Sequence, residues 1–386
     1  MNFIKNLSYL FAILILSSGL YGQGSMNKVT IHGYGGWSYG KTDHNNYLNG
    51  VKDGNYEQTT FALNTTAQPS SSLRIIGQIE WLSNSSILIT ELDYAFASWS
   101  FSIGPELRLG RVKHPFGLYA EIYNIGTVRP FFSLPQGIYG YSDIIAEGFN
   151  GAGLTNSHYS QSSNWGIQYD VYFGQFDYKS SEIWEELEES PNEEETSEFE
   201  LERATAVGGR LNVFTGIEGL KLGVSAYFGE NKSDDEEAEE ESEESEESST
   251  RAVAGTHLEY MSDRVSLRSE YAYLTDGEGD NSEKVNAFYL EIGVKVTEKL
   301  QLAGRYDHSS ASISEIEEEE LDSLFKHRDF GLGINYWFSS SFAVKFSYHF
   351  VDGNRFATPG DIIESLEANT LDEKTNLIQF GTQFSF

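Results

Sequence analysis

Apolar and polar side chains alternate along most of this chain, and the alternation limits the folds that it can adopt. In residues 285–296, VNAFYLEIGVKV, one parity holds Phe288, Leu290 and Ile292. The other parity holds Glu291 and Lys295. A period of two residues predicts a β-strand with one apolar face and one polar face. Sixteen segments show this pattern, near residues 28–37, 56–66, 71–82, 87–99, 104–113, 144–155, 164–176, 201–214, 219–229, 251–261, 264–274, 285–296, 299–308, 327–338, 341–350 and 375–386.

The connections between these segments are alternately short and long. Those after even-numbered segments are short, for example TGIE and TE, whereas those after odd-numbered segments are mostly long, with residues 83–86 as the exception. An even-stranded transmembrane barrel has short periplasmic turns and long outer loops, and closure leaves no unpaired strand edge in lipid. We therefore predict an all-β fold over residues 23–386, a sixteen-stranded antiparallel transmembrane β-barrel with long acidic extracellular loops. A secreted two-sheet β-protein is the alternative.

The N-terminal stretch has the pattern of a targeting segment. Lys5 precedes an apolar core at residues 9–16, and small residues follow as far as Gly22. This order predicts a secretory signal peptide over residues 1–22. A membrane anchor is the alternative, but the apolar core is shorter than the roughly 20 residues that a spanning helix needs. A signal peptide before a barrel predicts the outer membrane of a Gram-negative bacterium.

Negative charge is concentrated in a few segments of the chain. The formal net charge is −33, and most of it comes from residues 179–200, 230–250 and 309–322. Phosphate binding needs a basic face, so no nucleic-acid partner is expected. Acids crowded at a pore mouth raise the local cation concentration over about 8 Å in physiological salt, which predicts a preference for cations. The chain has no cysteine, which excludes disulfides and thiolate sites.

One acidic run offers oxygen ligands to hard cations. It contains Asp234, Asp235, Glu236, Glu237, Glu239 and Glu240. Ca²⁺ and Mg²⁺ prefer oxygen ligands, so loose binding of either ion is a hypothesis, and such ions would bridge the loops to lipopolysaccharide in the surrounding outer-membrane lipid. The alternative is a solvated segment without a defined metal site. No other cofactor is expected.

Two stretches resemble a known family. Residues 107–140, LRLGRVKHPFGLYAEIYNIGTVRPFFSLPQGIYG, resemble a strand and the following loop of Gram-negative outer-membrane porins, with a distant similarity to the phosphate-selective O and P porins. The last segment ends on Phe386, which resembles the assembly signal of such barrels. The resemblance implies a homotrimer and an inward-folded constriction loop over residues 114–142. The lysine-rich pore of anion-selective members has no counterpart here, so phosphate selectivity is not implied.

Charged side chains on the polar parity are expected to line the lumen. A bulge at Gly110 would turn Arg111 and Lys113 inward as well. Opposed charges in a pore orient polar solutes, although pairing across neighbouring strands is the alternative role. The remaining predicted lumen and constriction residues are Arg74, Glu80, Glu91, Asp93, Arg108, Arg129, Glu147, Asp170, Arg210, Lys221, Arg268, Glu270, Glu291, Lys295, Arg305, Asp307 and Lys345.

These observations favour a porin, which passes small hydrophilic solutes and cations by passive diffusion. Two alternatives stay open: a substrate-specific channel, for example for oligosaccharides, and a surface barrel without a channel whose acidic loops bind divalent cations or a partner. Ser347 and His349 could suggest a hydrolase. A barrel phospholipase needs its triad on the lipid side, whereas His349 lies on the polar parity, so no enzymatic activity is predicted.

Overall fold

The computed structural model describes residues 28–84, 87–140, 144–160, 165–179, 201–232, 249–277, 282–312, 319–358 and 371–386. The predicted signal peptide, residues 1–22, lies outside the described residues. So do the acidic run that contains Asp234 to Glu240, residues 180–200 and residues 313–318.

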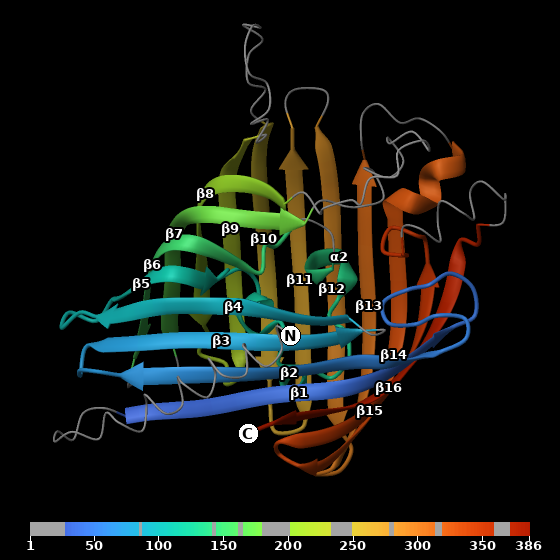
Figure 1. Ribbon diagram of the computed structural model, residues 1–386, viewed down its shortest axis with the longest axis horizontal. Coiled ribbons are helices and arrows are strands. Elements are labelled where there is room, and N and C mark those ends of the chain that lie inside the picture. The colour runs from blue at the N-terminus through green and yellow to red at the C-terminus, as the bar shows by residue number, and fades with distance from the viewer. Residues whose placement is uncertain are drawn as a thin grey trace, which may run out of the picture.

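Sixteen strands form one closed antiparallel barrel, in which each strand pairs with its neighbours in the chain and β16 pairs with β1 (Figure 1). The predicted all-β, sixteen-stranded antiparallel barrel is confirmed, and each strand lies within a few residues of its predicted segment. The strands are β1 (Lys28–Thr42), β2 (Asn55–Gln68), β3 (Leu73–Asn84), β4 (Ile87–Ser100), β5 (Glu106–Lys113), β6 (Gly148–Tyr159), β7 (Gly166–Lys179), β8 (Leu201–Phe214), β9 (Leu220–Lys232), β10 (Ser249–Met261), β11 (Val265–Asp276), β12 (Glu283–Lys295), β13 (Leu300–Ser312), β14 (Lys326–Ser339), β15 (Phe342–Asp352) and β16 (Lys374–Ser385).

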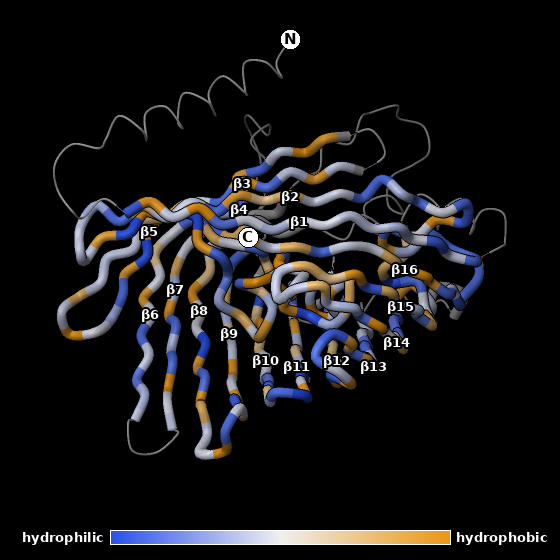
Figure 2. The backbone as a smooth tube through the Cα atoms, turned by 90° about the horizontal axis from the view of Figure 1, so that it is seen from below, coloured by the Kyte–Doolittle hydropathy of each residue, from blue (hydrophilic) through white to orange (hydrophobic). Residues whose placement is uncertain are grey.

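The two faces of the barrel wall are opposite in polarity. Along β12, Leu290 and Ile292 are exposed on the outside, whereas Tyr289 and Glu291 are buried on the inside. Hydropathy alternates in the same way along many strands (Figure 2). An apolar outer face is stable only in contact with lipid, so the observed polarity of the two faces agrees with the predicted division between lipid outside and polar groups within. Among the described residues, no helix is long and apolar enough to cross a membrane.

The first and last strands close the ring through regular pairing. Gly33 and Phe386 exchange two backbone hydrogen bonds of 3.0 and 2.9 Å at the short-turn end. The Phe386 ring stacks on Phe61 of β2 at 6.1 Å between ring centroids. A side chain at position 33 would collide with the Phe386 ring, so glycine at position 33 allows this closure.

The connection between β5 and β6 turns into the barrel. It holds η1 (Ala120–Ile122), η2 (Gly126–Val128) and the short helix α2 (Gln136–Tyr139), which packs on β12 and β13. We call residues 114–140 the inner loop. One further short helix, η4 (Glu319–Phe325), precedes β14.

The irregular position in β5 is Gly110, with φ of 131°. The pairing of β4 with β5 runs through Gly110 without a register shift, so the predicted bulge is not present there. A register shift lies instead on the next pair, between Gln78 and Ile79 of β3 and opposite Asp93 of β4. The positive φ of Gly110 re-aims the chain beyond it, because glycine has no Cβ to oppose that conformation.

Candidate constriction site

Glu270 of β11 holds both ends of the inner loop. Its carboxylate accepts hydrogen bonds from the hydroxyl of Tyr139 at 2.6 Å and from the backbone N–H of Leu118 at 3.1 Å. The hydroxyl of Tyr289, on the neighbouring strand, donates a third bond of 2.5 Å. Because one carboxyl group bonds to both ends of the inner loop and to the neighbouring strand, Glu270 fixes the start and the end of the inner loop against one patch of wall.

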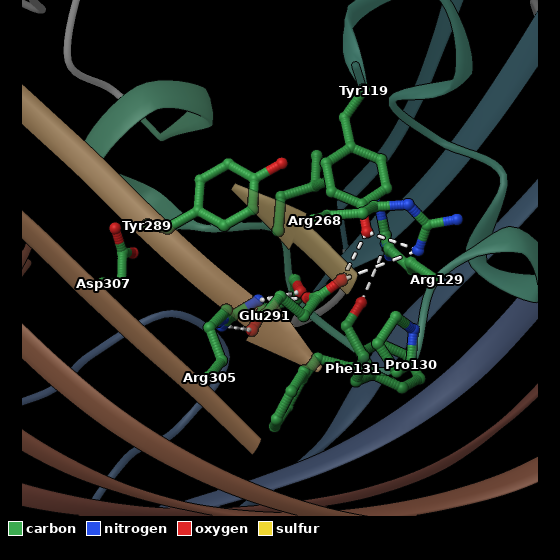
Figure 3. Close-up of polar contacts among 12 residues, drawn as sticks. Tyr119, Arg129, Pro130, Phe131, Arg268, Tyr289, Glu291, Arg305 and Asp307 are labelled. Carbon is green, nitrogen blue, oxygen red and sulfur yellow. Dashed lines mark hydrogen bonds and ion pairs between the residues drawn. The ribbon is translucent and has the colours of Figure 1, made fainter. Parts of the chain in front are cut away.

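Glu291 of β12 holds the next part of the inner loop (Figure 3). The hydroxyl of Tyr119 donates to its Oε1 at 2.5 Å. Two guanidinium groups compensate its charge, because Arg268 lies 3.7 Å and Arg305 lies 3.8 Å from its carboxylate oxygens. A buried carboxylate is tolerated only when it is paired and hydrogen-bonded, and Glu291 meets both conditions.

Asp307 of β13 caps the helix α2. Its Oδ2 accepts the backbone N–H of Gln136 at 2.5 Å and that of Gly137 at 3.2 Å. The first N–H groups of a helix have no partner within the helix. A carboxylate of the barrel wall therefore satisfies them, which fixes the returning part of the inner loop.

Basic residues of the wall bind carbonyl oxygens of the same loop. Arg305 donates to the carbonyl of Ser133 at 2.8 Å, and its guanidinium lies 4.6 Å from the ring centre of Phe131. Lys345 of β15 donates to the carbonyls of Gly126 and Arg129 at 2.7 and 2.5 Å. The side chains of Arg305 and Lys345 are almost fully buried, so these charges contact protein groups rather than an open pore.

Arg210 of β8 joins the wall to an acid of the inner loop. It donates to Asp170 of β7 at 2.8 Å, to Glu121 at 2.5 Å and to the carbonyl of Gly117 at 3.3 Å. Burial on its own would raise the pKa of Glu121, but Arg210 and Arg108 together hold that pKa below its ordinary value. Glu121 is therefore negatively charged at neutral pH.

An aromatic cluster surrounds the point where the inner loop leaves β5. His114 packs against Phe176 at 4.8 Å and against Tyr172 and Tyr227 at 5.2 Å between ring centroids. Its Nε2 lies 2.8 Å from the Tyr172 hydroxyl. Burial lowers the pKa of His114 to about 3, so the imidazole is neutral in the folded protein.

The opposite side of the lumen, along β3 to β6, keeps charged groups in contact with water. The side chain of Arg74 is 41% exposed and forms an ion pair with Glu106. Arg108 lies 3.3 Å from Glu106 and 3.5 Å from Glu121 of the inner loop. Partly exposed charges of both signs thus meet at the edge of the inner loop, in a pattern that acts on a passing polar solute.

A second charged group lies nearer the long loops. Lys113 forms an ion pair with Asp93, and its Nζ lies 3.8 Å from Glu147. Arg111 donates from Nε to the carbonyl of Asp93 at 3.1 Å. Glu80, which pairs across strands with Glu91, accepts a 2.5 Å bond from Asn124 of the inner loop. The inner loop therefore contacts the wall at β3 as well as at β12.

The predicted site residues thus fall into two sets. Arg210, Arg268, Glu270, Glu291, Arg305 and Lys345 bind the inner loop, whereas Arg74, Glu80, Glu91, Asp93, Arg108, Arg111, Lys113 and Glu147 gather on β3 to β6 and at the residue before β6. Arg129 donates to two carbonyls within the inner loop itself. Lys295 is exposed at the end of β12, apart from both sets.

Glu106, Tyr119 and Glu121 are among the contributors that are absent from the predicted set. Glu106 shares the parity of Arg108 two positions later, so the alternation could have identified it. Tyr119 and Glu121 lie in the inner loop, which has no period of two. No sequence signal pointed to them, because their roles depend on the wall residues that they meet.

Ser347, His349 and Asp329 are hydrogen-bonded in the order that serine hydrolases use. The His349 Nε2 lies 3.0 Å from the Ser347 hydroxyl, and its Nδ1 lies 2.8 Å from Asp329. All three side chains are buried, and Phe131 packs edge-on against the imidazole. A nucleophile needs access to substrate and an oxyanion hole. These hydrogen bonds instead hold the Asp329 carboxylate in place, where it lies 3.7 Å from Arg305.

Within the described part of the chain, no group of three or more His, Asp or Glu side chains is arranged to hold a metal ion. The predicted acidic run that contains Asp234 and Glu240 lies outside that part, so loose binding of Ca²⁺ or Mg²⁺ remains a hypothesis.

Neither the protein-family models nor the curated proteins include a match to this sequence. Solved structures do match. OmpT, an outer membrane protein of Vibrio cholerae in a trimer form, aligns with 94% of this chain and 100% of its own at 12% identity and a TM-score of 0.57. Salmonella typhi OmpF in complex with daunomycin aligns with 93% of this chain and 98% of its own at 14% identity and 0.57. The anion-selective porin from Comamonas acidovorans aligns with 93% of this chain and 100% of its own at 13% identity and 0.54.

At these identities the likeness establishes the fold, which is the closed sixteen-stranded barrel of outer-membrane porins. The apolar outer face agrees with it, because a barrel of this kind is stable only with lipid around it. The chain is a closed sixteen-stranded β-barrel of the porin fold, and its likeness to Gram-negative outer-membrane porins supports an outer-membrane location.

Proposed function

We propose that this barrel is a porin that passes small hydrophilic solutes by passive diffusion between the inner loop and the wall formed by β3 to β6. The observation that carries the proposal is the set of partly exposed charges at this edge. On the wall, Arg108 lies 3.5 Å from Glu121 of the inner loop and Arg74 forms an ion pair with Glu106, and the side chains of Arg74, Arg108 and Glu121 each keep a share of their surface exposed. A water-filled lumen lined by both signs of charge admits polar solutes and disfavours apolar ones.

The preference for cations rests on the acidic segments rather than on the constriction. Around the inner-loop edge, Arg74 and Arg108 are balanced by Glu106 and Glu121. The acidic segments connect strands at the long-loop end, where their charge attracts cations within about a Debye length of 8 Å in physiological salt. A cation preference that is set by charges at the pore mouth weakens as the salt concentration rises, because salt screens those charges.

Planar-bilayer recording of the refolded mature chain tests the channel. Conductance that rises with salt without saturating supports a general porin. Conductance that a sugar blocks identifies the substrate-specific alternative, in which tyrosines line the path. A barrel that inserts without conducting supports the surface-protein alternative. The inner loop contacts both β3 and β12, so it narrows the lumen, and this narrowing is the observation that favours a barrel without a channel as the second candidate.

A salt-gradient measurement tests the cation preference. The reversal potential of the full chain is compared with that of a variant lacking Asp234 to Glu247. The matched control keeps the same acids in scrambled order. We expect the deletion to shift the reversal potential toward zero and the scrambled variant to keep it. An unchanged potential in the deletion variant contradicts the assignment of selectivity to this segment.

We also propose a homotrimer. The outer face of β2 to β5 carries a groove of about 480 Å³ whose lining includes Thr65, Ala67, Gly77, Ala95 and Ala97. Small residues allow close approach of a second barrel, and the V. cholerae relative exists in a trimer form. Mass measurement in mild detergent of the wild type and of Ala95→Trp tests this, since the bulky residue is expected to yield monomers. A wild type that is monomeric at all concentrations contradicts it.

Outer-membrane lipid and lipopolysaccharide are the proposed surroundings, with Ca²⁺ or Mg²⁺ bridging the acidic loops to lipopolysaccharide phosphates. Calcium is titrated onto the barrel in vesicles with and without lipopolysaccharide. A rise in melting temperature that requires both supports the bridge, and no rise contradicts it. The similarity to the O and P porins stays a hypothesis over residues 107–140, and no enzymatic activity is proposed.

A further inference from the structure

Charged groups of the lumen are sorted along the axis of the barrel. At the short-turn end, Arg74 is the second residue of β3 and Arg108 the third of β5. Lys221 is the second residue of β9, and Lys295 is the last residue of β12. All four side chains lie on the lumen parity, and each keeps part of its surface exposed.

The acids at the short-turn end do not cancel these bases. Glu106 and Glu259 are the acids on the lumen parity within three residues of the strand ends at this end of the described barrel. They are shared among several bases, because Glu106 pairs with Arg74 and Arg108, while Glu259 pairs with Lys221 and Arg268. A ring with a surplus of positive charge therefore surrounds this mouth.

The long-loop half of the same wall has the opposite sign. Glu80, Glu91 and Asp93 lie on β3 and β4. Glu147 directly precedes β6. Lys113 and Arg111 are the bases of this part of the wall, where Lys113 forms ion pairs with Asp93 and Glu147 and Arg111 donates to the carbonyl of Asp93, so four acids stand against two bases. In the sequence, each of the three acidic segments comes directly after a strand that ends at the long-loop end.

We propose that the channel is bipolar and rectifies current, with an anion-collecting ring at its short-turn mouth. Fixed positive charge enriches small anions such as chloride or carboxylates, and fixed negative charge enriches cations, each over a Debye length of about 10 Å at 0.1 M salt. The two regions lie in series in one lumen. This inference rests on the proposed function, because it requires a conducting lumen.

The sign of the asymmetry follows from this order of charges. A positive potential on the long-loop side drives cations from their enriched region toward the basic ring and drives anions in the opposite direction. Both ions then accumulate between the regions, and conductance rises. The reverse potential depletes the same zone. We expect about a twofold higher current with the long-loop side positive at 0.1 M salt and equal currents at 1 M, where the Debye length is about 3 Å.

Single-channel recording with oriented barrels tests this. The chain has no cysteine, so a cysteine at the exposed Lys52 of a long loop, labelled from one chamber, reports the orientation. The test variant combines Arg74→Gln with Lys221→Gln on the lumen wall. Its matched control combines Arg264→Gln with Lys299→Gln, which remove the same charge from exposed short turns at the same end.

We expect rectification to fall to near unity in the lumen variant and to persist in the turn variant. Both variants keep partners for the remaining acids, because Arg108 stays beside Glu106 and Arg268 stays beside Glu259, and heat-modifiable gel migration verifies folding. Symmetric current in a conducting wild type overturns the inference and leaves the porin intact, as does rectification of the opposite sign or equal loss in both variants. A barrel that never conducts overturns the proposed function and this inference together.

Discussion

At the scale of single residues, a backbone conformation decides where the inner loop begins. Gly110 has φ of 131°, and a Cβ at this position would collide with the carbonyl oxygen of Ala95. We expect Gly110→Ala to destabilise the barrel by about 1–3 kcal/mol, the range for strained backbone positions. Gly304→Ala is the matched control, because its nearest neighbour is an Ile292 methyl at 3.7 Å. Urea unfolding in vesicles measures both, and equal stability of the two variants would contradict the role given to Gly110.

The residue scale also predicts a response to acid. His114 is neutral when folded because burial lowers its pKa to about 3, whereas an unfolded histidine has a pKa near 6.5. Below pH 6.5 the histidine is protonated in the unfolded chain but not in the folded one. The free energy of unfolding therefore falls as the pH falls toward 3. We expect His114→Phe, which keeps an aromatic ring in the cluster, to weaken this loss between pH 6.5 and 4.5.

Melting temperatures at a series of pH values measure the effect. His158→Phe is the control, because His158 is exposed on the outer face of β6. The control is expected to follow the wild-type profile. A His114→Phe profile parallel to the wild type would show that another group carries the acid response. Glu121 contributes at lower pH, because its lowered pKa gives stability that is lost only as the pH falls through that value.

At the scale of elements, the inner loop is held by wall residues that lie far away in the sequence. Lys345 donates to the carbonyls of Gly126 and Arg129. Lys345→Met keeps the apolar stem and removes the donors, which leaves buried carbonyls unsatisfied at about 1–3 kcal/mol. We expect faster proteolysis of the inner loop and noisier single-channel current. Lys326→Met, at an exposed site, is the control. Identical current noise in both variants would contradict the role of Lys345 in anchoring the inner loop.

The same scale explains what the sequence could and could not predict. Strands were predictable because the period of two is local, as the exposed and buried positions of β12 illustrate. The family resemblance implied that the inner loop folds inward, but its contacts were not predictable, because they join distant positions such as Tyr119 and Glu291, which are 172 residues apart. Parity placed Glu291 and Arg305 inside the barrel. The alternation did not indicate that atoms of the inner loop, rather than water, contact these two side chains.

At the scale of the whole molecule, the barrel has a polar interior and an apolar exterior, so its stability depends on the surrounding lipid. This gives a depth-dependent prediction on a single strand. Leu290 lies near the middle of β12 and Val296 lies just beyond its end, and both are exposed on the outer face. We expect Leu290→Arg to cost about 2–4 kcal/mol in lipid vesicles and Val296→Arg about 0–1 kcal/mol, because a charge is most expensive at the bilayer midplane.

The comparison of the two variants carries the argument, since both add the same side chain to the same face. Refolding into vesicles of defined thickness, followed by urea unfolding, gives both free energies. In a thinner bilayer the midplane cost should fall, while the cost at the strand end should stay small. Equal costs at the two depths would mean that β12 does not cross the hydrocarbon, and the channel proposed for the lumen would then lack its membrane.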